Sequence, residues 1–316
     1  MKTDKKPDIV VILPCYNEEL CIESVVMDFR NVLPDARIFV YDNNSTDETA
    51  EVARTAGAIV KKEPLQGKGN VIRRMFSDIE ADVYVMADGD GTYDASAAPA
   101  LIKKLVDEDL DMVVGSRYET EKKSYRPGHR FGNFFLTTLV KKIFGYGFED
   151  ILSGYRVMSR RYVKTFPVIS SGFEIETEMS VHALQMQIPV AEVKTPYGAR
   201  PEASPSKLNT YRDGFRILFT IIGLMASERP RLLFGIIGSI FTFLGIVLAI
   251  PLLATWLNTG LVPRFPTAIL CTGLMIFAVL SFVYGWLIHV VRRGRIETKR
   301  LAYLHYRTVA SEIDSK

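Results

Sequence analysis

Apolar and polar positions alternate in blocks along the first two-thirds of the chain. Short apolar runs of strand length are each followed by a longer stretch with helical spacing, beginning with the run 8–13 and the stretch 18–33. Buried strands that alternate with helices are typical of a parallel sheet covered on both faces. The predicted strands are 8–13, 37–41, 58–61, 82–87 and 112–115, and the predicted helices are 18–33, one ending near 56, 66–79 and 95–108.

The pattern changes after residue 228, where charged residues nearly vanish. Segment 232–257 contains no charged residue, and segment 265–291 contains none apart from the ionisable His289. Each is longer than the roughly 20 residues that a helix needs to cross a bilayer. Two transmembrane helices are therefore favoured over two buried core helices, because core helices are seldom so long and so free of charge.

The residues that flank these segments predict an orientation. Arg229 and Arg231 precede the first segment and five basic residues lie in 292–300, whereas the connection 258–264 carries one arginine. The positive-inside rule places the N-terminal domain and both termini in the cytoplasm. The membrane expected to hold the protein is the plasma (inner) membrane. Stretch 208–227 has apolar residues at spacings of three and four, which suits a helix in the membrane interface or one packed on the domain.

Four parts are predicted from these patterns. They are a cytoplasmic α/β domain (1–207), an amphipathic juxtamembrane helix (208–230), two transmembrane helices (231–291, at about 232–257 and 265–291) and a basic cytoplasmic tail (292–316). The net charge of +3, without a basic stripe, argues against a nucleic-acid partner. The three cysteines lack metal-ligand spacing and fit a reducing, intracellular setting, and the polar N-terminus carries no secretory signal.

Polar clusters follow four of the predicted strands. Ligands of such sheets bind outside the carboxyl ends of the strands. Asp88-Gly89-Asp90 by itself could be an acidic turn. However, two carboxylates at a strand tip also suit Mg²⁺ or Mn²⁺, because hard cations take carboxylates together with substrate phosphates. Four clusters at one edge favour a site, and they are 16–18, 42–43, 88–90 and 116–117.

Taken together, these motifs resemble family 2 glycosyltransferases with the GT-A fold. The resemblance rests on the segments 11–19, 42–47, 67–69 and 88–90, in this order. Segments 115–118, 130–133, 153–156, 172–178 and 206–208 look like the polyprenyl-phosphate branch, which includes dolichol-phosphate mannose synthases and bacterial undecaprenyl-phosphate sugar transferases. The implied fold is an α/β, mainly parallel GT-A sheet sandwich followed by a two-helix transmembrane hairpin.

The resemblance also implies roles for individual residues. Asp88, Asp90, Arg117 and Arg130 would be catalytic, with Asp88 and Asp90 facing the metal and the diphosphate. The nucleotide donor would be bound by Pro14, Tyr16, Asn17, Glu18, Asp42, Lys68 and Asp88, and the acceptor phosphate by Arg117, Arg130 and Lys207. Arg126 is an alternative to Arg130, and one of Glu174, Glu176 and Glu178 could contact the sugar.

Two departures from the family pattern limit what can be transferred. The second strand ends in Asp42-Asn43-Asn44-Ser45, where many relatives have Asp-Asp-Gly-Ser, so the backbone shape of this loop is left open. Gly91-Thr92-Tyr93 follows Asp90, where several relatives have Leu-Gln. Contacts to the donor sugar therefore do not transfer.

The implied reaction is the metal-dependent, inverting transfer of a sugar from a nucleotide diphosphate to a polyprenyl (undecaprenyl) monophosphate, in the making of cell-envelope glycans. Similarity to bacterial members favours a UDP-hexose or UDP-N-acetylhexosamine donor. A homo-oligomer is compatible with a two-helix anchor. The alternatives are a processive or other lipid or polysaccharide enzyme of family 2 and, from another class, a non-catalytic membrane sensor of sugar nucleotides or a scaffold.

Overall fold

A computed structural model of the chain describes residues 6–119, 147–172, 174–198 and 228–311, together with the single residues 138, 141, 223 and 226. The chain divides into two compact units, Met1–Thr210 with Lys299–Lys316, and Tyr211–Thr298. Arg126, Arg130, Lys207 and most of the stretch 208–227 lie outside the described residues.

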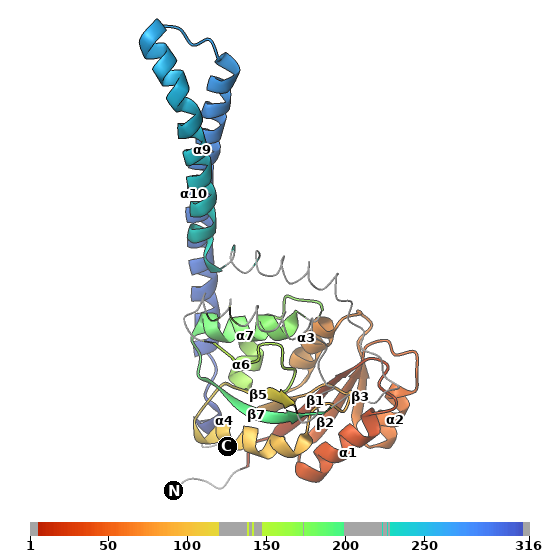
Figure 1. Cartoon of the computed structure of the whole chain (residues 1–316). Helices are drawn as coiled ribbons and strands as arrows, with labels where there is room; N and C mark the ends of the chain where they lie inside the picture. The colour runs from red at the N-terminus through yellow and green to blue at the C-terminus, as the bar shows by residue number, and fades with distance from the viewer. Residues whose placement is uncertain are drawn as a thin grey trace. The chain divides into compact units, whose positions relative to one another are not determined.

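A seven-stranded sheet forms the centre of the first unit (Figure 1), in the order β3-β2-β1-β4-β6-β5-β7. All pairings are parallel except those of β6, which runs antiparallel to β4 and to β5. The five predicted strands are present, whereas the sequence pattern did not single out β6 and β7. The strands are β1 (Ile9–Cys15), β2 (Arg37–Asp42), β3 (Ile59–Lys62), β4 (Val83–Met86), β5 (Met112–Glu119), β6 (Arg156–Ser159) and β7 (Val190–Tyr197).

Helices cover both faces of this sheet (Figure 1). On one face, α1 (Ile22–Val32), α2 (Thr49–Thr55) and α4 (Ala98–Asp107) bury apolar side chains in a common core, and α4 follows a short 3₁₀ helix, η1 (Ala95–Ala97). On the other face lie α3 (Lys68–Asp78), α6 (Arg160–Thr165) and α7 (Ile175–Met186). Helix α7 buries polar side chains as well as apolar ones.

A fully buried arginine joins β6 to α7. The Arg156 guanidinium donates to the carbonyl oxygens of Ser153 (2.9 Å) and Ile151 (3.0 Å). It also donates to the Glu176 carbonyl oxygen and the Ser180 hydroxyl, both at 2.9 Å. A buried charge is costly unless its donors are satisfied, and these acceptors satisfy it. Arg156 therefore fixes the segment 151–155 against the beginning of α7.

The last segment of the chain belongs to the first unit. The Tyr303 hydroxyl donates to Asp111 Oδ2 (2.6 Å), and the Arg161 guanidinium pairs with the same carboxylate and lies over the Tyr303 ring. Val309 is buried in the same hydrophobic core as side chains of α1 and α4. The residues from Lys299 onward thus contribute to the stability of the first unit.

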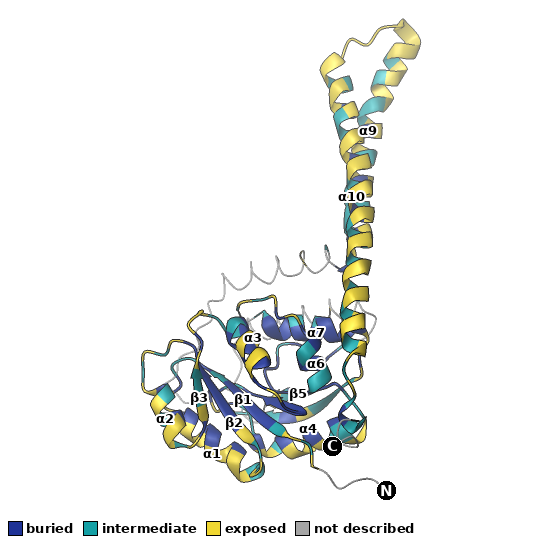
Figure 2. Cartoon of the chain, turned by 180° about the vertical axis from the view of Figure 1, so that it is seen from behind, coloured by how far each residue is buried: buried dark blue, intermediate teal, exposed yellow. Residues whose placement is uncertain are grey.

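From Pro230 onward, the described part of the second unit contains two long helices, α9 (Pro230–Thr259) and α10 (Phe265–Leu304), and the last residues of α10 belong to the first unit. Both are long and apolar enough to cross a membrane. Figure 2 shows their surfaces largely exposed. Gly238 lies against the Phe282 ring and Gly285 against Phe234, so glycines let the two backbones approach closely.

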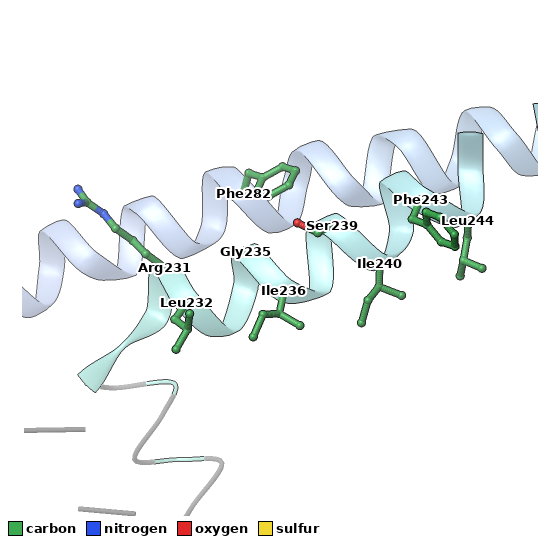
Figure 3. Close-up of a pocket in the computed structure, with 9 residues that line it drawn as sticks. All are labelled: Arg231, Leu232, Gly235, Ile236, Ser239, Ile240, Phe243, Leu244 and Phe282. Atoms are coloured by element: carbon green, nitrogen blue, oxygen red, sulfur yellow. The ribbon is translucent and has the colours of Figure 1, made fainter. Parts of the chain in front are cut away.

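A groove of about 520 Å³ runs along α9. Its walls are apolar except at Arg231 and Ser239. Figure 3 shows Leu232, Ile236 and Ile240 projecting to the same side of the helix. Such a surface is compatible with contact with lipid chains rather than with water. The lining consists of Arg231, Leu232, Gly235, Ile236, Ser239, Ile240, Phe243, Leu244 and Phe282.

Candidate active site

The ends of the neighbouring strands β2, β1 and β4 bring three of the four predicted polar clusters together, whereas the fourth, 116–117, lies within β5 rather than after it. Cys15 at the end of β1 is in register with Asp42 at the end of β2, and the Asn43 amide donates to the Cys15 carbonyl (2.9 Å). On the other side of β1, the backbone at Gly89, which follows β4, lies close to the Cys15 side chain. A Cβ atom on Gly89 would lie 2.4 Å from the Cys15 sulfur. Glycine between the two aspartates is therefore required by packing.

The loops after β1 and β2 are joined by hydrogen bonds. The Asn17 amide donates to the Ser45 hydroxyl (2.9 Å), and Asn17 Oδ1 accepts from the Thr46 amide (2.8 Å). Asp42 is 2% exposed and accepts from the Ser45 amide (3.1 Å). Asn44 occupies the position of the family's glycine with a φ of 62°, a left-handed conformation that asparagine tolerates. Thus the loop takes a glycine-like turn without glycine.

Asn43, for which no individual role was predicted, holds the glycine loop in place. Its Nδ2 donates to the carbonyl oxygens of Glu63 (2.9 Å) and Leu65 (2.7 Å), and its Oδ1 accepts from the Gly67 amide (2.7 Å). Gly67 has a φ of 127°, which favours glycine. The only sequence signal for Asn43 was its place at a strand tip.

Lys68, which begins α3, forms ion pairs with Asp88 and Glu176. The three side chains are 10%, 28% and 6% exposed. The pKa of the Asp88 carboxyl is raised overall, mainly because the group is removed from solvent. The Lys68 ammonium lowers this pKa, and the charges of Asp90 and Glu176 raise it. Burial lowers the pKa of Lys68, but the two carboxylates outweigh burial and raise it, so the ammonium group stays charged. One largely buried cation is therefore shared by the buried Glu176 carboxylate and the partly buried Asp88 carboxylate.

The three glutamates of segment 172–178 have different environments. Glu176 faces Lys68, whereas Glu178 accepts from the backbone amides of Ile169 (2.9 Å) and Ser170 (2.7 Å). Glu174 directly precedes α7. Glu176 is thus joined through Lys68 to Asp88, and Glu178 holds the backbone before α7.

A divalent ion fits this cluster if substrate phosphates complete its coordination. No group of three or more His, Cys, Asp or Glu side chains within the described residues could enclose a metal alone. Mg²⁺ usually binds one or two carboxylates together with substrate phosphates. Asp88 already binds a cationic group, and Asp90 is 3% exposed with Thr92 donating to its Oδ1 (2.6 Å from the hydroxyl). These two carboxylates suit a metal that arrives with a diphosphate.

Arg117 on β5 is held in a fixed orientation. Its Nε and Nη2 atoms donate to the two Asp150 carboxylate oxygens at 2.6 and 2.9 Å, and its guanidinium lies over the Tyr197 ring. The segment that follows Asp150 reaches Asp88, because a Cβ atom on Gly154 would lie 2.9 Å from Asp88 Oδ2. The Gly154 amide also donates to the Tyr93 hydroxyl (2.8 Å). Thus one loop connects Arg117 with the carboxylate cluster.

Related sequences identify the family to which this chain is similar. The family model of glycosyl transferase family 2 matches residues 10–166. Glycosyltransferase AglJ of Haloferax volcanii is 35% identical and covers 88% of this chain and 92% of its own. Protein RfbJ of Shigella flexneri is 58% identical over 39% of this chain and 96% of its own. A dolichyl-phosphate hexose transferase of Haloferax volcanii is 27% identical over 71% of this chain and 97% of its own.

Solved structures share the fold. Glucosyl-3-phosphoglycerate synthase of Mycobacterium tuberculosis, in complex with Mn²⁺, UDP and glucosyl-3-phosphoglycerate, matches with a TM-score of 0.56 over 72% of this chain and 81% of that chain. The same enzyme with Mg²⁺ and UDP gives a TM-score of 0.57. At 22% identity this likeness concerns the fold, and it confirms the predicted GT-A-like sheet with its helices. The chain, with its two apolar C-terminal helices, belongs to glycosyl transferase family 2.

Proposed function

We propose that the protein is a membrane-anchored glycosyltransferase that moves a sugar from a nucleotide diphosphate to a polyprenyl monophosphate. One observation carries the proposal. Asp88, just after β4, pairs with Lys68 at the start of α3, which also pairs with Glu176 in the first turn of α7, and this cluster occurs in a chain that also has two helices long and apolar enough to cross a membrane. An acceptor with an apolar tail stays in the bilayer, so an enzyme that uses it benefits from an anchor. The similarity to a dolichyl-phosphate hexose transferase supports this class of acceptor.

On the donor side, Asp88 and Asp90 would hold Mg²⁺ or Mn²⁺, and the loops after β1 and β2 would bind the nucleotide. When bound, the ion neutralises the charge that develops on the departing nucleoside diphosphate. The hydrogen bonds of Asn17 and Asn43 fix these loops beforehand. Little conformational freedom is then lost when the nucleotide binds. The donor would be a UDP-hexose or UDP-N-acetylhexosamine; the UDP complexes of the structural relative support the uridine part of this proposal only.

On the acceptor side, a phosphate monoester is largely ionised at neutral pH because its second pKa is about 6. Its oxygen can attack the anomeric carbon without a strong general base, with inversion there. Arg117 would bind this phosphate, since a planar guanidinium matches phosphate geometry and Asp150 fixes its plane. Arg130 and Lys207 would add positive charge. The reaction would take place on the cytoplasmic side of the membrane.

The test is a turnover assay with the full chain in detergent, undecaprenyl phosphate, Mg²⁺ or Mn²⁺ and a panel of UDP- and GDP-sugars. Mass spectrometry would detect a lipid-linked sugar. Asp90→Asn should abolish most of the product. Asp94→Asn is the matched control, because Asp94 lies in the same segment and its carboxylate accepts from the Ser96 backbone amide (2.8 Å) at the start of η1.

A product that requires both the metal and Asp90 would support the proposal and would identify the donor. A product formed equally well with a chelator would contradict the metal dependence. Binding of a nucleotide sugar without a lipid product from any donor would contradict the polyprenyl acceptor and favour a sensor.

A further inference from the structure

The Lys68 ammonium binds a carboxylate that is also expected to bind the metal ion. It contacts Asp88, one of the two carboxylates expected to bind the ion, and its second partner Glu176 is almost fully buried. Glu176 lies in the first turn of α7, where the positive end of the helix dipole stabilises a carboxylate. Lys68 therefore has two anionic partners, of which only Asp88 belongs to the predicted metal pair.

The loop geometry keeps Lys68 at this position. The Gly67 amide is bound by Asn43, and the Gly69 amide donates to the Ser171 carbonyl (3.0 Å). A Cβ atom on Gly69 would lie 2.0 Å from the Ser170 carbonyl oxygen, so this contact also requires glycine. Because the backbone on both sides of Lys68 is fixed, its ammonium group is a tethered cation rather than a mobile surface charge.

We propose that Lys68 competes with the divalent ion for Asp88, and that Glu176 retains Lys68 when the ion arrives. This inference rests on the proposed function, because the ion is expected to come with a nucleotide sugar. Without a nucleotide, a metal at Asp88 would meet the adjacent ammonium charge, and in a buried site this repulsion is weakly screened. The diphosphate supplies negative charge that offsets the repulsion. Lys68 thereby makes metal binding dependent on the nucleotide.

This coupling is reciprocal. If the nucleotide raises the affinity for the metal, the metal raises the affinity for the nucleotide by the same factor. Lys68 acts here as a positioning residue, because it sets the order in which the charges of the site are assembled. Glu176 should raise the affinity of the site for the metal, because it adds negative charge and offers Lys68 a second partner.

The experiment measures Mn²⁺ binding by the full chain in detergent, with and without UDP, from the electron paramagnetic resonance signal of free Mn²⁺. Lys68→Met should bind Mn²⁺ in the absence of UDP at least about tenfold more tightly than wild type. UDP should then increase the Mn²⁺ affinity of the variant by a correspondingly smaller factor. Lys68→Gln is a second neutral variant in case the methionine form folds poorly. Glu176→Gln should weaken Mn²⁺ binding.

The matched control is Lys104→Met, which removes an exposed lysine that pairs with Glu108 and should leave Mn²⁺ binding unchanged. A merely structural role of Lys68 predicts equal or weaker Mn²⁺ binding in both neutral variants, and that result would overturn the inference. If wild type makes a lipid-linked sugar but the neutral variants bind Mn²⁺ no more tightly, only the inference fails. If the Mn²⁺ shifts appear but no lipid-linked sugar forms, only the proposed function fails.

Discussion

Replacing His182 by glutamine should remove a pH dependence from the stability of the first unit. His182 lies in α7 and is 3% exposed, and its ring packs against those of Tyr162 (5.8 Å) and Phe166 (5.2 Å). No hydrogen-bond partner of its Nδ1 atom occurs among the described residues. Burial and, secondarily, the charge of Lys299 lower the pKa of His182 from 6.5 to about 3. The side chain is thus a neutral packing residue.

The sign and size of the effect follow from proton linkage. The unfolded chain binds a proton at His182 near pH 6.5, whereas the folded protein does so only near pH 3. Protonation therefore favours the unfolded state as the pH falls below 6.5, and the stabilising contribution is complete above that pH. Between about pH 7.5 and pH 5, this group alone should lower the free energy of unfolding by about 2 kcal/mol. For a unit of this size that corresponds to a loss of about 4–8 °C in Tm.

The assay is thermal unfolding of the full chain in detergent at these two pH values, followed by near-ultraviolet circular dichroism. Glutamine cannot titrate, and its packing defect is the same at both pH values, so the Tm difference between them should be smaller in His182→Gln by the stated amount. Lys299→Met should give an intermediate difference, since it removes the second cause of the shift. Equal Tm differences in wild type and His182→Gln would refute the reasoning.

Three further substitutions test other contacts by their effect on the free energy of unfolding. Tyr303→Phe removes a hydroxyl bound to Asp111 and should cost about 1.5–3 kcal/mol, and an unchanged Tm would show that this contact does not secure the C-terminal segment. Gly89→Ala should cost about 1–3 kcal/mol, because the added Cβ atom clashes with the Cys15 sulfur. Adding Cys15→Ala to this variant should restore most of the lost stability, and a double variant as unstable as Gly89→Ala alone would contradict the clash. Arg156→Lys should destabilise the protein by about 3 kcal/mol or more, because an ammonium cannot reproduce the planar fork, and a lysine variant as stable as wild type would disprove the need for that fork.

The metal and nucleotide residues illustrate what local sequence can predict. Asp88, Asp90 and Asp42 stand at the ends of apolar runs, and the carboxyl ends of parallel strands meet at one edge, so their proximity could be foreseen. The contacts around these aspartates could not be foreseen. The hydrogen bond between Asn43 and Gly67 and the ion pair between Lys68 and Glu176 join residues that are far apart in the chain.

The sequence by itself determined the periodicity of the strands and helices, the polar strand ends and the two long apolar helices, because each depends on residues within a few turns of one another. Only the tertiary structure decided that antiparallel β6 lies between β4 and β5, that Arg156 is buried against α7, and that residues from Lys299 onward complete the first unit. The physical reason is that a four-residue strand beginning with arginine has no local preference for its place in the sheet. Its burial is stabilised by carbonyl groups that come together only when the whole sheet has formed.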